Sequence, residues 1–492
     1  MISESVARTP VRSSLAGGTE PVAARSPTLA GAVEWERIGL SGEGRPIVAR
    51  LLHAPSDRPR LVIVAGQHGD EAAGRAAVAE WVGRTFASFR ERGDAPPVGI
   101  AAVVDANPDG AARRRRSNAA GVDLNRDHYR LMAPETRALH GLVRRFRPHF
   151  LVDVHDYPAR RRHLLAQGWT IGADVQIAPP THPAIRTSLG PEEWAGLLVS
   201  VFAHLGARGY SATPYTLLGR SGRARPSTLR TRDARNAIAL RYGIPTLLLE
   251  GRDLGRDRTE SAMARTVAAQ IAALEAVVAW AGAHAEVLVR GPPIPQPGEV
   301  VPLGARWTEA GSPTTVLLQR AAEGLTEAVR WDRYAGSLEV RRTVPLPRAY
   351  AVRADLLATL ELLERQDLVG EPITTSRFAL ATPTMGKDDD PAVPGRPTAP
   401  TDVQGYVAYS VHQRGGRALA VWLERRSRSR ALQREREASG ADRTSGLPIL
   451  RIDRWDYRPP AEAGPVAPFG ILREGVAAVD PFPGTTRSRE VP

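Results

Sequence analysis

The chain has 492 residues, a formal net charge of +13 and no cysteine. This length allows about two to four domains, and the lack of cysteine excludes disulfides, thiolate metal ligands and a cysteine nucleophile. No stretch approaches the roughly 18 consecutive apolar residues of a membrane span, so we expect no segment that crosses a membrane.

The positive charge is the first indication of a partner, because basic surfaces attract nucleic acids. The basic residues are, however, almost all arginine, with Lys387 the only lysine, and they are spread along the chain. Aromatic residues, on which bases could stack, make up only 5% of the sequence. We therefore expect no nucleic-acid partner.

Composition divides the chain into three parts. Residues 1–32 are rich in Ser, Ala, Arg and Pro, which predicts a disordered leader. The leader lacks the apolar h-region of a signal peptide, so the protein is expected in the cytoplasm unless the start is misassigned. A Pro/Gly-rich linker beginning at Gly291 separates a domain at 33–290 from a region at 291–492, which we expect to be partly disordered and of unknown function.

In the first domain, apolar runs alternate with stretches of helical composition. Residues 33–53 predict one or two edge strands that turn near Gly42. Further strands are expected at 61–65, 98–104, 150–154 and 246–249, and helices at 72–91, 134–146, 191–205 and 259–289. Because these strands are continuously apolar and separated by helices, they indicate an α/β sheet covered on both faces. Sites in such sheets gather beyond the strand ends.

The region after the linker gives a weaker pattern. Short alternating segments at 299–344 suggest β structure, and 354–365 predicts an amphipathic helix. Residues 382–401 resemble a loop, 425–436 a charged and solvated segment, and the final thirty residues an irregular tail. No chemical motif follows residue 290, so we expect a smaller α+β region to which the sequence assigns no activity.

A possible metal site stands where the strand at 61–65 ends. His68 and Glu71 follow that strand at a spacing of three, directly before a helix. Zinc accepts His nitrogen and Glu oxygen, although so short a pattern can equally be a polar turn. His155 stands at a second strand end, a position at which a single His is more often structural. Together, two His and one Glu would form a catalytic zinc set.

Five motifs in the stretch 60–253 then resemble the M14 (carboxypeptidase A-like) zinc carboxypeptidases, in the order typical of that family. They are H-x-x-E at 68–71, N-P-D-G at 107–110, R-x-N at 116–118 followed by G-V-D-L-N-R at 121–126, the strand-end His155, and L-L-L-E-G-R-D at 247–253. The resemblance implies a mixed, mostly parallel sheet with helices on both faces. It does not extend beyond about residue 290.

The resemblance also implies a role for each motif residue. One Zn²⁺ ion would be held by His68, Glu71 and His155, and Asp123 would orient a ligand imidazole. Asn125 and Arg126 would hold the substrate's terminal carboxylate, and Arg116 would stabilise the oxyanion. Glu250 would be the general base that takes a proton from the zinc-activated water; without the resemblance, it could equally be a surface Glu paired with Arg252.

One family feature is missing, and one segment suggests a substrate preference. Tyr210, Tyr215 and Tyr242 are available as a substrate-side tyrosine, but none has the spacing of the family's animal members. The segment 228–240 is expected to line the specificity pocket and contains three arginines. They suggest a preference for an acidic side chain, although solvent-facing arginines would give the same sequence.

Three functions remain open from the sequence. The first is a metallocarboxypeptidase, a zinc-dependent hydrolase of C-terminal peptide bonds. The second uses the same site as a zinc amidohydrolase on N-acyl amino acids or cell-wall peptides. In both, the partner is a peptide or acyl-amino-acid substrate with a free carboxylate. The third is a binding protein with a vestigial site whose basic surface holds an anionic polymer; the complete set of ligands, base and anchor argues against it.

Overall fold

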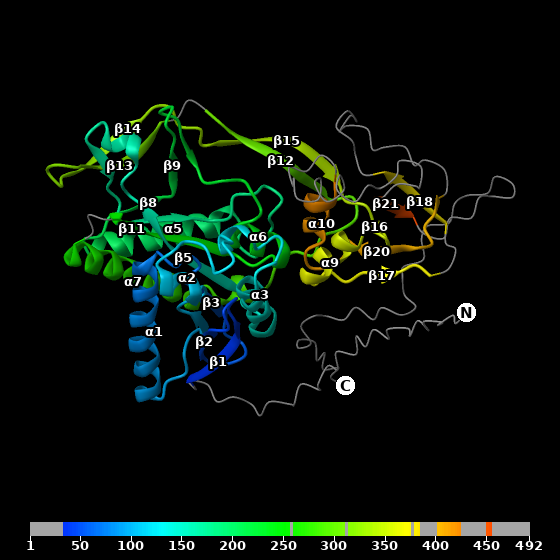
Figure 1. Ribbon diagram of the computed structural model, residues 1–492, viewed down its shortest axis with the longest axis horizontal. Coiled ribbons are helices and arrows are strands. Elements are labelled where there is room, and N and C mark those ends of the chain that lie inside the picture. Colours follow the sequence, from blue (N-terminus) through cyan, green and yellow to red (C-terminus); the bar gives the residue numbers. More distant parts are fainter. Residues whose placement is uncertain are drawn as a thin grey trace, which may run out of the picture.

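The computed structural model describes residues 33–255, 259–309, 313–374, 378–383, 401–424 and 449–454. The expected leader at 1–32, the charged segment at 425–436, most of the loop at 382–401 and the final thirty residues lie outside this description. Within it, an eight-stranded sheet with its helices forms the first half of the molecule. A smaller unit with a six-stranded sheet lies beside it (Figure 1).

The large sheet is mixed and mostly parallel, as predicted. Its strands follow the order β1 (Val33–Leu40), β2 (Pro46–Leu52), β4 (Gly99–Val103), β3 (Arg60–Val64), β5 (Phe150–Pro158), β11 (Thr246–Asp253), β7 (Val175–Ala178) and β8 (Ala212–Pro214). The four central strands, β4, β3, β5 and β11, are parallel to one another. The β1–β2 hairpin closes one edge in antiparallel register. The expected edge hairpin is therefore confirmed.

Helices cover both faces of this sheet. On one face lie α1 (Ala72–Arg92), α5 (Pro191–Ala207) and α7 (Glu260–Ala283), and on the other α3 (Pro134–Phe146) and α6 (Ala234–Tyr242). The position of β3 between the two covered faces explains why its sequence is continuously apolar. Leu61 and Ile63 belong to the first core, whereas Val62 and Val64 belong to the second, because alternate side chains point to opposite faces.

Helix α7 differs from the prediction in two respects. By length and composition it could span a membrane, with a mean hydropathy of 1.5 over its most apolar window. That window is 61% buried inside the protein, where the helix packs against α1 and α5, as a core helix does. The predicted single helix at 259–289 also breaks at His284, whose Nδ1 is hydrogen bonded to the Trp280 carbonyl, and resumes as α8 (Ala285–Val289).

Strands β5 and β11 are longer than predicted. Each continues four residues past its apolar run because the two strands pair in parallel from Leu151 to Pro158 and from Thr246 to Asp253. His155 and Glu250 therefore lie inside strands rather than in the loops that follow them. Backbone pairing with the neighbouring strand holds both residues, and this explains why polar side chains there remain in β conformation.

The second half begins with an arm, which we define as residues 300–345. It consists of a two-stranded ribbon, β12 (Val300–Thr308) and β15 (Ser337–Pro345), and a hairpin, β13 (Thr314–Arg320) and β14 (Thr326–Trp331). The ribbon leads from the smaller unit back across the first half (Figure 1). There β13 pairs with β6 (Trp169–Ile171), which belongs to the first half. The expected β structure at 299–344 is thus present.

The smaller unit is an α+β structure. Its sheet has the order β17 (Glu371–Pro372), β20 (Tyr406–Ser410), β16 (Ala349–Arg353), β21 (Ile449–Arg454), β18 (Phe378–Pro383) and β19 (Thr401–Asp402), accompanied by α9 (Leu357–Arg365) and α10 (Gly416–Leu423). The helix expected at 354–365 is therefore present but begins at Leu357. Most of this sheet was not predicted.

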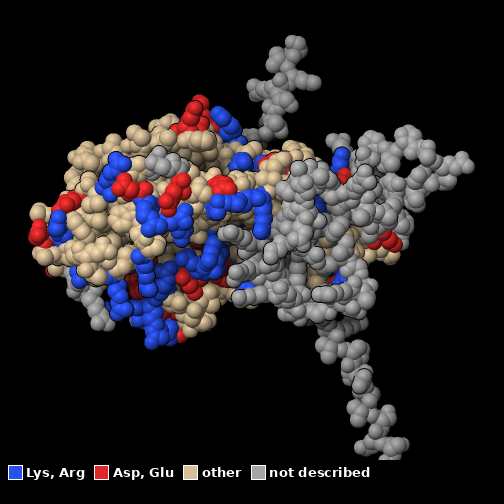
Figure 2. Space-filling model, turned by 90° about the horizontal axis from the view of Figure 1, so that it is seen from above, with Lys and Arg blue, Asp and Glu red and all other residues tan. Residues whose placement is uncertain are grey.

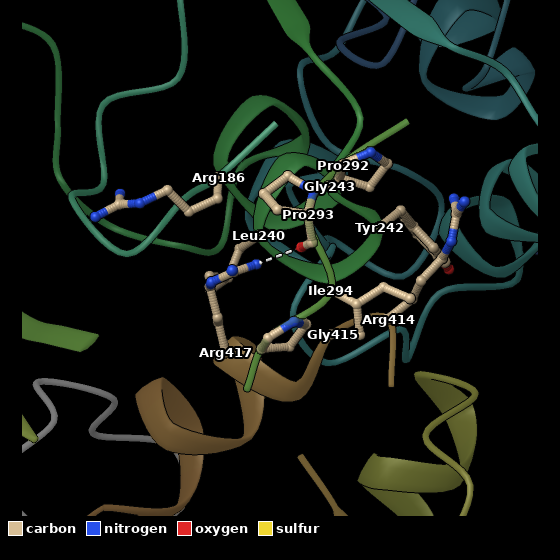
Figure 3. A pocket seen from close by; sticks show the side chains of 11 residues that line it. Arg186, Leu240, Tyr242, Gly243, Pro292, Pro293, Ile294, Arg414, Gly415 and Arg417 are labelled. Carbon is tan, nitrogen blue, oxygen red and sulfur yellow. Dashed lines mark hydrogen bonds between the residues drawn. The ribbon is translucent and has the colours of Figure 1, made fainter. Parts of the chain in front are cut away.

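The linker joins the two units rather than separating them. Pro292, Pro293 and Ile294 line a small pocket with residues of α6 and α10 (Figure 3). Arg417 of α10 donates from Nη1 to the Pro293 carbonyl at 2.9 Å. From the first half, Arg241 donates to carbonyl oxygens of Gln366, Asp367 and Arg414. Arginine donors on backbone carbonyls, buried or partly buried, therefore fix the junction.

Candidate active site

Three side chains that could bind a metal ion converge at one edge of the large sheet. His68 and Glu71 come from the loop between β3 and α1, and Glu71 is the N-cap of that helix. His155 comes from β5. Its Nδ1 lies 3.1 Å from His68 Nδ1 and 2.8 Å from a Glu71 carboxylate oxygen, and the other Glu71 oxygen lies 2.6 Å from His68 Nδ1. One donor atom of each residue lies within 4.8 Å of the others.

Close backbone packing positions the loop that carries His68. Gly69 lies against α2 (Pro108–Arg113) so tightly that a Cβ atom would be 2.0 Å from the Gly110 carbonyl carbon. Asn107 caps α2 by accepting from the Gly110 amide and donates to the Gln67 carbonyl. The Asn-Pro-Asp-Gly motif is therefore a support for the ligand loop.

Charges in this cluster compensate one another. Burial alone would raise the pKa of Glu71, but His155 and His68 outweigh it and hold the pKa well below its usual value. Burial would likewise lower the pKa of His155, yet Asp153 and Glu71 raise it well above the ordinary histidine value. Two imidazoles facing one carboxylate are the donor set that catalytic zinc prefers, so the residues present fit that ion.

Each of the two imidazoles, those of His68 and His155, also has a carboxylate near its second ring nitrogen, Nε2. Asp123, the predicted orienting residue, lies 3.1 Å from His68 Nε2. His155 Nε2 lies 2.9 Å from Asp153, a residue that our sequence analysis did not select. Such carboxylates fix the tautomer and orientation of a metal-binding His. The sequence does contain a signal for Asp153, because residues two apart on a strand share a face.

The predicted substrate residues surround the cluster. Asn125 Nδ2 lies 3.0 Å from His155 Nε2, and Asn125 Oδ1 accepts from the Ala234 amide. Arg126 is exposed and donates to the Asn125 carbonyl. Arg116 is 45% exposed and makes contacts of 3.1 Å with Asp123 and 3.4 Å with Glu71. These three roles remain predictions, and Asn125 already has partners for both ends of its amide.

Glu250 lies beside the cluster on the neighbouring strand. It is directly opposite His155 in the parallel pairing of β11 with β5. Burial raises its pKa to about 7, opposed by His155 and supported by the negative charge of Glu71. Carboxylates with pKa values raised in this way are suited to proton transfer near neutral pH. The position is therefore appropriate for a general base.

Of the three candidate tyrosines, one is near the predicted base. Tyr210 packs on the core beside Arg265, and Tyr242 is hydrogen bonded to the buried His140. Tyr215 immediately precedes β9 (Thr216–Leu218). Burial raises its pKa, and Glu250 raises it further. Sequence spacing could not select it because a hairpin, rather than a motif, brings it to the site.

Comparison with known proteins agrees with this geometry. Residues 22–157 match the family model described as zinc carboxypeptidase. Carboxypeptidase 2 of Trichophyton rubrum is 28% identical over 236 residues, which are 44% of this chain and 42% of that protein. Carboxypeptidase 2 of Trichophyton tonsurans is 32% identical over 112 residues, 22% of this chain and 20% of that protein. The chain thus spans less than half the length of these curated relatives.

Solved structures with similar regions include two carboxypeptidases. A metallo-carboxypeptidase from Burkholderia cenocepacia has a TM-score of 0.36 and 19% identity, covering 49% of this chain and 63% of that one. Carboxypeptidase A from Helicoverpa armigera has a TM-score of 0.39 and 13% identity, covering 52% and 70%.

Proposed function

We propose that the protein hydrolyses the C-terminal peptide bond of its substrate. The premise is that the first half of this chain belongs to the zinc carboxypeptidase family. One observation carries the proposal above all others. His68, Glu71 and His155 bring their donor atoms together, and Glu250 lies alongside in register with His155.

The three donors would hold one zinc ion. When bound, zinc would polarise a carbonyl oxygen and lower the pKa of a water molecule. Asp123 and Asp153 support this role, because each lies against the second nitrogen of a ligand imidazole and keeps its metal-facing nitrogen free of a proton. Arg116 beside Glu71 and Asp123 balances part of their negative charge.

Glu250 would move the proton. As a carboxylate it accepts a proton from the attacking water, and as a carboxylic acid it returns that proton to the leaving amine nitrogen. A pKa near neutrality favours both directions, since the group is then neither too weak a base nor too weak an acid. The charge of Glu250 raises the pKa of Tyr215, and we propose that the Tyr215 hydroxyl takes part in substrate binding beside this group.

Arginine side chains would orient the substrate. Arg126 is exposed, so its guanidinium is available to the free carboxylate of a C-terminal residue. Arg116, also exposed on the cluster side, is suited to the oxyanion that forms as the carbonyl is attacked. Recognition of a free carboxylate distinguishes an exopeptidase from an endopeptidase.

Metal content and substrate choice together test the proposal. The purified full chain should retain about one zinc per molecule after dialysis, hydrolyse N-blocked dipeptides, and lose that activity with a chelator. C-terminal amides of the same dipeptides should not be cleaved. Hydrolysis of N-acyl amino acids without hydrolysis of blocked dipeptides would favour the amidohydrolase, and a zinc-loaded protein that cleaves neither class would overturn the proposal.

A further inference from the structure

A row of buried, hydrogen-bonded side chains leads away from the proposed metal site. It consists of Asp153, Gln67, His128, His140 and Tyr242, and we call it the buried network. Successive members lie 2.6, 2.7, 3.1 and 2.9 Å apart, and each is at most 9% exposed. Arginine and acidic side chains on the surface of this half can bond to solvent (Figure 2). The buried network depends instead on partners within the protein.

Every hydrogen bond in the buried network has a fixed direction. Gln67 donates from Nε2 to Asp153 Oδ1, so its Oε1 accepts from His128 Nε2. Burial lowers the pKa of His128 to about 4, and the neutral ring therefore accepts at Nδ1. His140 must then donate from Nε2 and accept at Nδ1 from the Tyr242 hydroxyl. All four donors are directed toward Asp153, so these hydrogen bonds polarise one another.

The carboxylate at the end of the buried network depends on Gln67 for its orientation. Oδ1 of Asp153 lies 2.9 Å from His155 Nε2 and also accepts from Gln67. Oδ2 of Asp153 is buried and has no hydrogen-bond partner within the described residues. Gln67 is thus the second donor that fixes the carboxylate against the imidazole of His155. The amide of Gln67 is in turn held at Oε1 by His128.

One residue of the smaller unit contacts the buried network near both of its histidines. Gln366 follows α9 and is fully buried. Its Nε2 donates to the carbonyls of His128 and Tyr129 at 3.0 and 2.7 Å. Its own carbonyl accepts from Arg241, the residue before Tyr242. Tyr242 also lines the pocket at the junction of the two units (Figure 3). The network therefore connects this junction to the proposed metal site.

We propose that His128 is a positioning residue for the metal site, acting through Gln67 and Asp153. Gln366 holds His128 in place from the second half of the chain. This inference rests on the zinc site of the function proposed above. It gives the smaller unit, to which no motif assigns an activity, a part in metal binding. Because His128 acts through other side chains, its loss should change zinc affinity and the geometry of the ligands.

Two substitutions of His128 separate positioning from packing. His128→Gln keeps a donor that can reach Gln67 Oε1, whereas His128→Leu fills similar space without one. Zinc affinity of the full chain is measured by competition with a chelating dye. In His128→Leu it should fall about threefold to tenfold, less than for loss of a carboxylate that contacts the ligand itself. His128→Gln should stay within about twofold of the wild type because the donor is kept.

Unfolding and cobalt spectroscopy distinguish this role from a purely structural one. Both variants lose the bond to His140, so thermal unfolding of the zinc-free proteins should show similar losses of stability. The visible spectrum of the Co²⁺-substituted protein reports ligand geometry and should change in His128→Leu but not in His128→Gln. Wild-type zinc affinity in His128→Leu, or equal losses of affinity in both variants, would overturn the inference. If His128→Leu does not fold, His128→Asn replaces it, since the shorter amide does not reach Gln67.

A second pair of variants tests the contribution of the smaller unit. Gln366→Leu removes the donor to the His128 carbonyl and should lower zinc affinity about twofold to fivefold, as loss of about one hydrogen bond would give. Combined with His128→Leu it should add little, because residues that act through one network are not additive. Gln413→Leu is the matched control, since Gln413 bonds to Val369 and Ser410 of the smaller unit. Equal affinities in Gln366→Leu and Gln413→Leu would overturn the role of Gln366.

Failure of this inference differs from failure of the proposed function, because zinc affinity and the cobalt spectrum are measured without substrate. If the wild type cleaves blocked dipeptides but all variants bind zinc equally, carboxypeptidase activity stands and the role of the buried network falls. If the variants follow the expected order but the zinc-loaded wild type cleaves no blocked dipeptide, the proposed function itself is wrong.

Discussion

Glu250 of β11 lies directly opposite His155 of β5 in the parallel register of the central sheet. A carboxylate with a pKa raised by burial is thereby held next to an imidazole of the proposed metal site, and backbone hydrogen bonds fix its strand on both sides. Because strand pairing rather than a flexible loop fixes this separation, substitutions of the side chain should change the chemistry without moving the ligands.

Glu250→Gln should therefore retain zinc and lose activity. The amide keeps the shape of the carboxylate but cannot accept a proton, so kcat/KM should fall by about 10²–10⁴-fold. Zinc content by elemental analysis serves as the control and should equal that of the wild type. Normal turnover in this variant would show that Glu250 is not the base.

The activity should decline on acidification because of the same residue. Burial raises the pKa of Glu250 from 4.5 to about 7, and a nearby dication would draw it down again by favouring the carboxylate. The base acts only when deprotonated, so kcat/KM should fall as the pH drops through a midpoint between 4.5 and 7. The limb should be absent from the residual activity of Glu250→Gln. An identical limb in both proteins would assign it to another group.

Asp153→Asn should weaken zinc binding. The carboxylate lies 2.9 Å from His155 Nε2, and loss of such an orienting group typically reduces metal affinity by about 10–100-fold. Competition with a chelating dye measures the affinity, and excess zinc should restore most of the activity. Asp127→Asn is the control: Asp127 is buried nearby but bonds the amides of Met132 and Ala133. Equal zinc affinities in Asp153→Asn and wild type would contradict the assignment.

Trp307→Phe should change substrate binding more than catalysis. Phenylalanine preserves most of the ring volume but removes the donor to the Ser227 carbonyl, so the segment between β10 (Ala224–Pro226) and α6 loses a support. We expect KM for an N-blocked dipeptide to rise about threefold to tenfold, as loss of about one hydrogen bond would give, with kcat nearly unchanged. A fall in kcat at constant KM would indicate a general effect on the catalytic centre.

Much of the first half could be predicted because its signals are local. The continuous apolar runs gave the central strands, since both faces of the sheet are covered, and Pro134 marked the start of α3. The order of the motifs brought His68, Glu71 and His155 into one hypothesis. Asp153 could also have been predicted, because the two-residue period of a strand places it on the same face as His155.

Other features depend on contacts between distant segments. Tyr215 and Ser227, to which Arg235 donates, come to the open end of the β9–β10 hairpin, whose strands have three residues each. Leu318 of β13 pairs with Ile171 of β6, although 147 positions separate residues 171 and 318 in the sequence. The arm carries no motif to indicate this partner. Long-range pairing of short strands leaves no periodic pattern in a single sequence.

The pairing of β13 with β6 also implies an order of folding steps. Residues near Ile171 leave the ribosome well before Leu318 is synthesised, and the proposed metal ligands all precede residue 156. These ligands can therefore assemble before β13 pairs with the edge of β6. Distant contacts form slowly because loop closure must precede them. In refolding of the full chain, zinc capture should therefore appear before full hydrolytic activity toward an N-blocked dipeptide. Simultaneous appearance of the two would show that the arm docks as early as the core.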